Sequence, residues 1–198
     1  IVAKEKMNDK GELSKAPCLF RFGMKLAMPG EFSTLDFYGL GPWDNYCDRK
    51  SAALLGHYVQ RVQDQYWYGY VRTQESGTKS DLRWLKVLSS SGTGIEITSD
   101  ARFSGSALPF SQKQMDSALS DPRPRKNPTN QQAGEATHSL ELLPLAHNDA
   151  RSLGTTYVNF DLKEMGVGGT DSWGRWPLEP YLVRPAEYEF NFVIRPVK

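Results

Sequence analysis

The sequence predicts an all-β fold, an antiparallel β-sandwich. Apolar residues alternate with polar or small residues at two places far apart in the chain, 20–28 and 188–194. Such a period of two places one face of a strand on a core and the other towards water or a neighbour. The 17 glycines and 12 prolines supply the turns that many short strands need. Helical periodicity is scarce, so we expect strands to dominate.

Several further segments carry the strand pattern. In chain order, all the predicted strands are 20–28, 35–38, 81–88, 94–98, 138–143, 155–161 and 188–194. Short helices are predicted at 48–55, with Asp48 as N-cap, and at 111–119. Residues 120–135 are rich in Pro, Asn, Gln and Gly, which predicts an exposed loop excursion. No internal repeat is present, so we expect one domain over 1–198.

The charge balance excludes two classes of partner. Lys and Arg number 24 and Asp and Glu 23, which gives a net charge of +1. We expect no nucleic-acid and no membrane partner, because polyanions and anionic bilayers attract a basic surface. No apolar run of about 18 residues predicts a membrane span. Cys18 and Cys47 make no disulfide framework and are expected to be free thiols.

The run Gly166-Val167-Gly168-Gly169 has the glycine content of a phosphate-binding loop. It follows a predicted strand, but Trp176-Pro177 soon after it is incompatible with a helix whose N-terminus could bind phosphate. Ser172 is no nucleophile elbow either, because Thr170 stands where that motif needs glycine. A glycine-rich β-loop that holds Trp173 in place is the favoured interpretation.

Neither a metal site nor a complete catalytic pair is predicted. The histidines are scattered and have no second ligand beside them in sequence: His57, His138 and His147. A glycosidase needs two carboxyl groups across the sugar. Asp44 and Asp48 are expected to make loop hydrogen bonds and a helix cap, and Glu187 and Glu189 share the solvated face of one strand. Glu75 alone completes no pair.

Tryptophans in predicted loops are the unusual feature of the composition. They are Trp43, Trp67, Trp173 and Trp176. A loop tryptophan offers a large flat apolar face and one hydrogen-bond donor. Such a face suits the C–H-lined side of a pyranose, and it suits a contact between domains equally well. Composition leaves both possibilities open.

Three stretches occur in a characteristic order and spacing. They are YGLGPWDNYCDR at 38–49, YVRTQESG at 70–77 followed by DLRW at 81–84, and MGVGGTDSWG at 165–174. Together they resemble the C-terminal, small-chain domain of the β-galactosidases of glycoside hydrolase family 2. With the strand-like segments between them, the resemblance covers nearly the whole chain.

The resemblance implies a supersandwich of the galactose mutarotase-like type that packs on a (β/α)₈ barrel of the same polypeptide. In that family the barrel supplies both catalytic glutamates and holds Mg²⁺ and Na⁺. The resemblance therefore implies no catalytic residue, metal ligand or cofactor in this chain. It also implies a β-galactoside such as lactose as substrate and a homo-oligomeric parent, while hydrolysis by the chain alone is not expected.

Substrate-binding residues are also implied by the resemblance. Trp173 matches the tryptophan that reaches into the active site of the family and stacks on the sugar. Support for its loop would come from Gly168, Gly169, Asp171 and Ser172. Glu75 and Gly77 match a loop at the mouth of the active site that helps its opening and closing.

Some positions depart from the family pattern. Thr170 stands where aspartate is usual, Thr73 where proline is common and Ser76 where asparagine is common. The segment 111–135 is longer than in relatives. The family domain also starts before Ile1, so an exposed, unpaired sheet edge is expected.

Two other classes of function remain open. One is a stand-alone carbohydrate-binding or mutarotase-like module, although a mutarotase needs a histidine and a glutamate that converge on the sugar. The other is a structural domain for subunit assembly, with the loop tryptophans as interface anchors. No signal peptide is visible, and the compartment stays open between cytoplasm and periplasm.

Overall fold

The computed structural model describes residues 18–66, 75–112, 115, 154–169, 171 and 175–198. They form one antiparallel sheet of seven strands, so the chain is all-β, as predicted, and the architecture fits a β-sandwich. The strands are β1 (Arg21–Pro29), β2 (Thr34–Gly41), β3 (Leu54–Arg61), β4 (Lys79–Leu88), β5 (Gly94–Leu108), β6 (Thr155–Glu164) and β7 (Phe192–Val197). The 3-10 helices are η1 (Val62–Gln65) and η3 (Glu179–Tyr181). In this described part of the chain, no helix has the length and apolarity that a membrane crossing requires.

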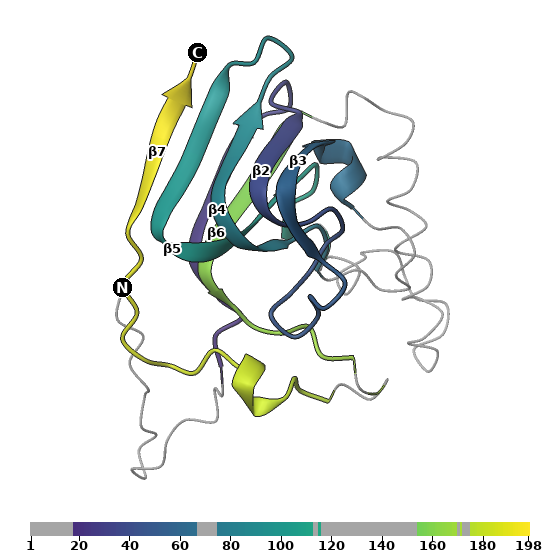
Figure 1. Cartoon of the computed structure of the whole chain (residues 1–198), viewed down its shortest axis with the longest axis vertical. Coiled ribbons are helices and arrows are strands. Elements are labelled where there is room, and N and C mark those ends of the chain that lie inside the picture. The colour runs from purple at the N-terminus through teal and green to yellow at the C-terminus, as the bar shows by residue number, and fades with distance from the viewer. Residues whose placement is uncertain (1–17, 67–74, 113–114, 116–153, 170, 172–174) are drawn as a thin grey trace, which may run out of the picture.

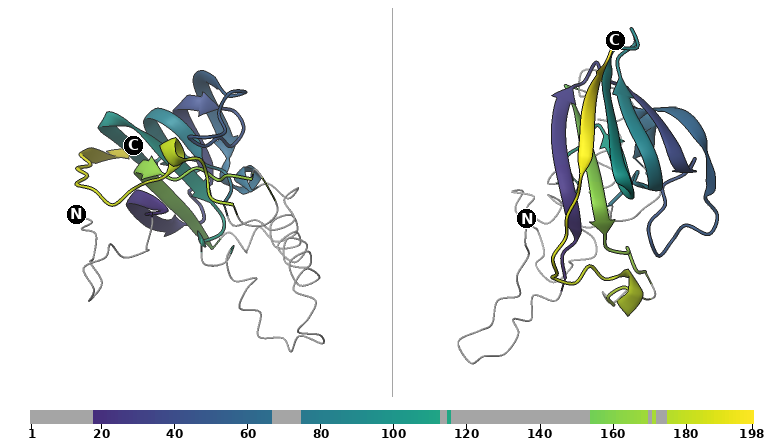
Figure 2. Two further views of the ribbon diagram at one scale, coloured as in Figure 1. Left: turned by 90° about the horizontal axis from the view of Figure 1, so that it is seen from below. Right: turned by 60° about the vertical axis from the view of Figure 1, so that its left-hand side comes forward.

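Strand β5 organises the sheet, whose order is β1-β6-β5-β4-β2-β3 with β7 also paired to β5. One side of β5 pairs with β4, and the other side is shared between two strands. Residues 94–99 pair with β7, and residues 104–108 pair with β6 (Figure 1). Figure 2 shows the sheet strongly curved, so that β1 and β6 turn away from the plane of β2 and β3.

The larger of two core clusters in the described residues takes its buried side chains from β2, η1, β4, β5 and β6, and partly buried residues of β1, β3 and β7 pack on it. Its buried members are Leu35, Phe37, Val62, Leu82, Leu85, Val87, Ile97, Phe103, Ala107, Val158 and Phe160. Partly buried residues that pack on it include Leu26, Met28, Tyr58, Phe190 and Phe192. Burying a side chain of this size stabilises the fold by about 1.5–3 kcal/mol. The shared core therefore holds β1 and β7 as well as the central strands.

The alternation at 20–28 correctly predicts β1, but only part of its apolar face is buried. Leu26 and Met28 pack on the core, whereas Phe20 is 71% exposed and Met24 is 41% exposed. Within the described residues, β1 and β3 are the two ends of the strand order. Phe20, just before β1, and Met24, within it, are therefore exposed apolar side chains at an edge strand of the described sheet, where a neighbouring surface could cover them.

The predicted helix at 48–55 is wrong. Turns occupy the start of that range, and Leu54 already begins β3. The sequence pattern missed β3 because its outward residues are apolar yet exposed: Val59, for example, is 62% exposed. An edge strand of this kind lacks the alternation of apolar and polar residues that marks a half-buried strand.

The remaining predictions have mixed outcomes. The predicted strand at 188–194 begins only at Phe192, although Tyr188 still packs against Phe22 with ring centroids 5.3 Å apart. Within the helix predicted at 111–119, Gln112 and Met115 are helical, and the Met115 amide donates to the Ser111 carbonyl at 3.2 Å. The rest of that helix, the strand at 138–143 and the excursion at 120–135 lie outside the described residues.

Candidate functional site

A turn between β2 and β3, residues 43–49, lies between two loops that the sequence singled out. Its central residue is Asn45, which is buried. The Asn45 backbone amide donates to the Thr78 carbonyl at 2.8 Å, and its side-chain oxygen accepts the Ser80 amide at 3.0 Å. The Asn45 side-chain amide donates to the carbonyls of Leu40 and Trp43, at 2.9 and 3.0 Å. Asn45 thus fixes the turn to the segment that contains Glu75 and Gly77.

On its other side the turn binds the glycine loop, residues 166–169. The Asp48 carboxylate accepts the amides of Val167 and Gly168, at 3.1 and 2.8 Å, and the Arg49 guanidinium donates to the Gly168 carbonyl at 2.9 Å. The prediction that Asp48 makes loop hydrogen bonds is confirmed, but it caps no helix. Cys47 adds a weak contact from its thiol to the Glu164 carbonyl at 3.4 Å.

The segment from Glu75 to Thr78 contacts the carbonyl of Gln65, the last residue of η1. Gly77 adopts φ +78°, and a Cβ there would lie 2.7 Å from the Gln65 carbonyl oxygen. The Ser76 hydroxyl donates to the same carbonyl at 3.3 Å. A left-handed backbone at a close approach to another main chain requires glycine. The structure therefore explains why glycine stands at this position.

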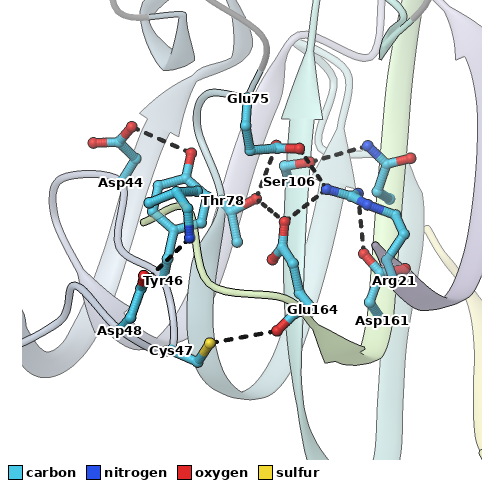
Figure 3. Close-up of polar contacts among 12 residues, drawn as sticks. Arg21, Asp44, Tyr46, Cys47, Asp48, Glu75, Thr78, Ser106, Asp161 and Glu164 are labelled. Carbon is cyan, nitrogen blue, oxygen red and sulfur yellow. Dashed lines mark hydrogen bonds and ion pairs between the residues drawn. The ribbon is translucent and has the colours of Figure 1, made fainter. Parts of the chain in front are cut away.

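A partly buried polar network around one arginine connects the Glu75–Thr78 segment with the start of the glycine loop. Arg21 at the start of β1 contacts three carboxylates: Glu164 at 2.6 Å, Glu75 at 2.7 Å and Asp161 at 3.1 Å (Figure 3). The Thr78 hydroxyl lies 3.4 Å from Glu75 and 3.3 Å from Glu164. The side chains of Asp161 and Glu164 are only 3% and 7% exposed. The network joins the Glu75–Thr78 segment to the end of β6, from which the glycine loop begins.

One guanidinium carries a single positive charge and cannot neutralise three carboxylates, two of which are buried. Burial raises the pKa of Asp161 to about 7, against the attraction of Arg21. Burial and the repulsion of Glu75 raise the pKa of Glu164 to about 8, and burial also raises the pKa of Glu75. Burial lowers the pKa of Arg21, but its carboxylate neighbours outweigh that effect and raise it. The network therefore retains a proton near neutral pH.

Lys79, the first residue of β4, is a second buried charge, with 2% of its surface exposed. Its ammonium lies 6.0 Å from the centroid of the Phe37 ring, and none of the described residues accepts a hydrogen bond from it. Burial lowers the pKa of Lys79 to about 8, although the charge of Asp44 opposes this shift. A desolvated ammonium of this kind costs folding free energy.

The structure describes five of the predicted site residues: Glu75, Gly77, Gly168, Gly169 and Asp171. It brings Glu75 into the same network as Glu164, two residues before the glycine loop. Asp171 accepts the Arg175 amide at 3.3 Å. Trp173 and Ser172 lie outside the described residues.

The network of Arg21, Asp161 and Glu164 was not predicted from the sequence. A charged residue inside a strand segment is more commonly solvated than buried, so the pattern gives no sign of this network.

Cys18 and Cys47 are free thiols, as predicted. His57 is 58% exposed and bonds Asp36 at 2.7 Å. Searched over the described ranges, the structure contains no group of metal-binding side chains large enough to hold an ion.

Comparison with known proteins gives one consistent relationship. The family model described as β-galactosidase small chain matches residues 2–194. The chain is 32% identical over 178 residues to a β-galactosidase of Halalkalibacterium halodurans. The aligned residues make up 89% of this chain and 15% of that protein. It is 33% identical over 162 residues to a β-galactosidase of Lactobacillus delbrueckii subsp. bulgaricus, covering 81% of this chain and 13% of that protein. It is 31% identical over 182 residues to a β-galactosidase of Photobacterium profundum, covering 91% of this chain and 14% of that protein. The chain thus spans only a small part of the length of these relatives.

Proposed function

Because the chain belongs to the β-galactosidase small-chain family, we propose that it serves as the C-terminal domain of a larger β-galactosidase of glycoside hydrolase family 2. In this proposal the domain packs on a catalytic barrel of the same polypeptide. That barrel supplies the two catalytic glutamates and the Mg²⁺ and Na⁺ sites. This chain supplies Trp173, whose ring stacks on a β-galactoside such as lactose.

The observation that carries the proposal is the anchoring of the glycine loop. Trp173 follows Gly169 by four residues, and the loop before it is bound by the carboxylate of Asp48 and the guanidinium of Arg49. After it, the Arg175 amide bonds Asp171. Substrate-binding aromatic residues benefit from a rigid support, since ordering a loop on binding costs free energy. The anchored glycine loop before Trp173 supports this role, and the bond from Arg175 to Asp171 links the residues on either side of Trp173.

The described carboxylates support placing the catalytic pair elsewhere. Retaining glycosidases hold two carboxyl groups about 5–5.5 Å apart, on opposite sides of the scissile bond. Glu75, Asp161 and Glu164 instead converge on one half-buried arginine, Arg21. Asp48 is engaged with backbone amides of the glycine loop. None of these four is therefore assigned as acid, base or nucleophile, and we expect the chain alone to hydrolyse no chromogenic galactoside.

The test is Trp173→Ala in the full-length protein. Loss of an aromatic contact worth about 1–2 kcal/mol raises the KM for lactose roughly 5–30-fold, while the melting temperature stays the same. Trp176→Ala is the matched control, since Trp176 is 48% exposed and belongs to the same region of the chain. An unchanged KM for lactose in Trp173→Ala would contradict the proposal.

A further inference from the structure

Two consecutive residues of the turn, Asp48 and Arg49, bind the glycine loop through its backbone. Asp48 accepts two successive amides, from Val167 and Gly168, and Arg49 donates to the carbonyl of Gly168. Hydrogen bonds to a charged group are about twice as strong as neutral ones. Both polar groups of Gly168 are therefore fixed by side chains that lie about 120 residues earlier in the chain.

The glycines of the loop leave room for these side chains. A Cβ on Gly166 would lie 2.5 Å from an Asp48 carboxylate oxygen. Gly169 has φ +87°, and a Cβ there would lie 2.9 Å from an Arg49 nitrogen. A side chain at either position would displace Asp48 or Arg49. The glycine content, which first suggested a phosphate-binding loop, thus serves the close approach of Asp48 and Arg49.

The turn itself is rigidly placed. The amide of Arg49 donates to the carbonyl of Tyr46 at 2.8 Å, and the amide of Tyr46 donates to the carbonyl of Arg49 at 3.1 Å. The turn is also tied to Thr78 through Asn45. On the opposite side of the glycine loop, the Gly166 amide donates to the Tyr181 carbonyl at 2.9 Å. Asp48 and Arg49 therefore transmit a fixed geometry to the loop.

We propose that Asp48 and Arg49 are positioning residues for substrate binding: they set the place of the glycine loop and so of the aromatic side chain that follows it. This inference rests on the proposed function. As positioning residues they act through the backbone of the glycine loop rather than on the sugar or the reacting atoms. They act on the binding of lactose through the glycine loop, so their loss weakens binding of lactose more than it slows the chemical steps.

The first test is Asp48→Asn in the full-length protein. Asparagine keeps the shape of the side chain but loses one acceptor and the charge, so one loop amide loses its partner. We expect the KM for lactose to rise roughly 3–10-fold with kcat changed less than about twofold, a pattern typical of lost ground-state binding. Arg49→Lys, at an exposed position, is the second variant and is expected to act in the same direction. Asp64→Asn is the control, because Asp64 is exposed and pairs only with Arg61 in the described structure.

A double-mutant cycle separates this inference from the proposed function. If Asp48 acts through Trp173, Asp48→Asn has no further effect on KM once Trp173→Ala is present. A raised KM in Trp173→Ala together with a normal KM in Asp48→Asn and Arg49→Lys would overturn the inference and leave the proposed function intact. Fully additive effects would overturn it as well. A normal KM in Trp173→Ala would overturn the proposed function itself.

Discussion

Arg21 and Glu164 stand opposite each other in the antiparallel pairing of β1 and β6, and their side chains form an ion pair of 2.6 Å although they are 143 residues apart in sequence. The pair is the centre of a network in which two further acids share the same guanidinium. Its stability therefore depends on both the arginine and the protonation of the acids.

Replacing the arginine removes the only cation that contacts the three acids in the described structure. Arg21→Met should lower the free energy of unfolding at pH 7 by about 3–5 kcal/mol, because buried carboxylates lose their partner. The exposed arginine Arg184, which pairs with Glu179, is the control. Arg184→Met should change the free energy by less than about 1 kcal/mol. Equal effects of the two substitutions in urea unfolding would contradict the prediction.

The pH dependence of stability follows from Asp161 and Glu164. Their pKa values rise from ordinary values of 3.8 and 4.5 to about 7 and about 8 on folding. Between the ordinary and the raised values, the folded chain binds more protons than the unfolded chain. The contribution to stability is therefore complete below about pH 4 and is lost as the pH rises to about 8. The loss is about 1.4 kcal/mol per pH unit for each proton held.

Glu164→Gln should flatten this profile and make the chain more stable than the wild type above pH 8. The amide keeps the shape of the side chain and removes a negative charge from the network. Glu187→Gln, at an exposed position, is the control and should leave the profile unchanged. Urea unfolding at pH 5, 7 and 8.5 measures it. If the stability of Glu164→Gln fell with pH as steeply as that of the wild type, Glu164 would not be the group that titrates.

Lys79 should have the opposite pH dependence. Its pKa falls from 10.5 to about 8 on folding, so between these values the unfolded chain binds more protons and stability rises with pH. Lys79→Met should stabilise the chain by about 1–3 kcal/mol at pH 7, since an apolar side chain of similar length replaces a buried charge. Lys25→Met, at an exposed position, should have little effect. A loss of stability in Lys79→Met would show that the ammonium has a stabilising role.

Gly77 and Gly92 separate backbone strain from steric contact. Both have positive φ, +78° and +83°, but a Cβ on Gly77 would lie 2.7 Å from the Gln65 carbonyl oxygen, whereas a Cβ on Gly92 would meet nothing within 4 Å. Gly92→Ala should cost about 1–2 kcal/mol from the left-handed backbone alone. Gly77→Ala should cost about 1–3 kcal/mol more, because the contact forces neighbouring atoms to move. Thermal unfolding of both variants measures the difference, and equal losses would exclude the contact as a cause.

Local pattern was enough to predict the strands that have one buried face. The alternation around Leu35 and Phe37 and the run at 155–161 fall inside β2 and β6. The family motifs located both loops of the candidate site. Asp48, by contrast, was predicted to cap a helix and instead accepts the amides of Val167 and Gly168. A side chain that can cap a helix can equally accept two free amides of a distant loop.

The buried network could not be predicted in the same way. A charged residue in a strand is ordinarily solvated, and sequence gives no sign that Arg21, Glu75 and Asp161 meet. Their meeting depends on the pairing of β1 with β6 and on the position of the segment before β4, both of which are tertiary. The exposed β3 failed for a related reason. Its outward apolar residues carry no information about an edge that only the assembled sheet defines.

The division of one side of β5 between β6 and β7 also bears on how the chain folds during translation. The strands β2, β3, β4 and β5 lie within residues 34–108. Once this segment has been synthesised, β2 can pair with β3 and β4, and β4 can pair with β5. One side of β5 can pair only after residues 155–164 and 192–197 have been synthesised, and β1 can pair with β6 only then, although β1 precedes the other strands in the sequence. Pairings of such long range form slowly. We therefore expect refolding to protect the amides of β2 to β5 before those of β1, a sequence of events that pulsed hydrogen exchange would record.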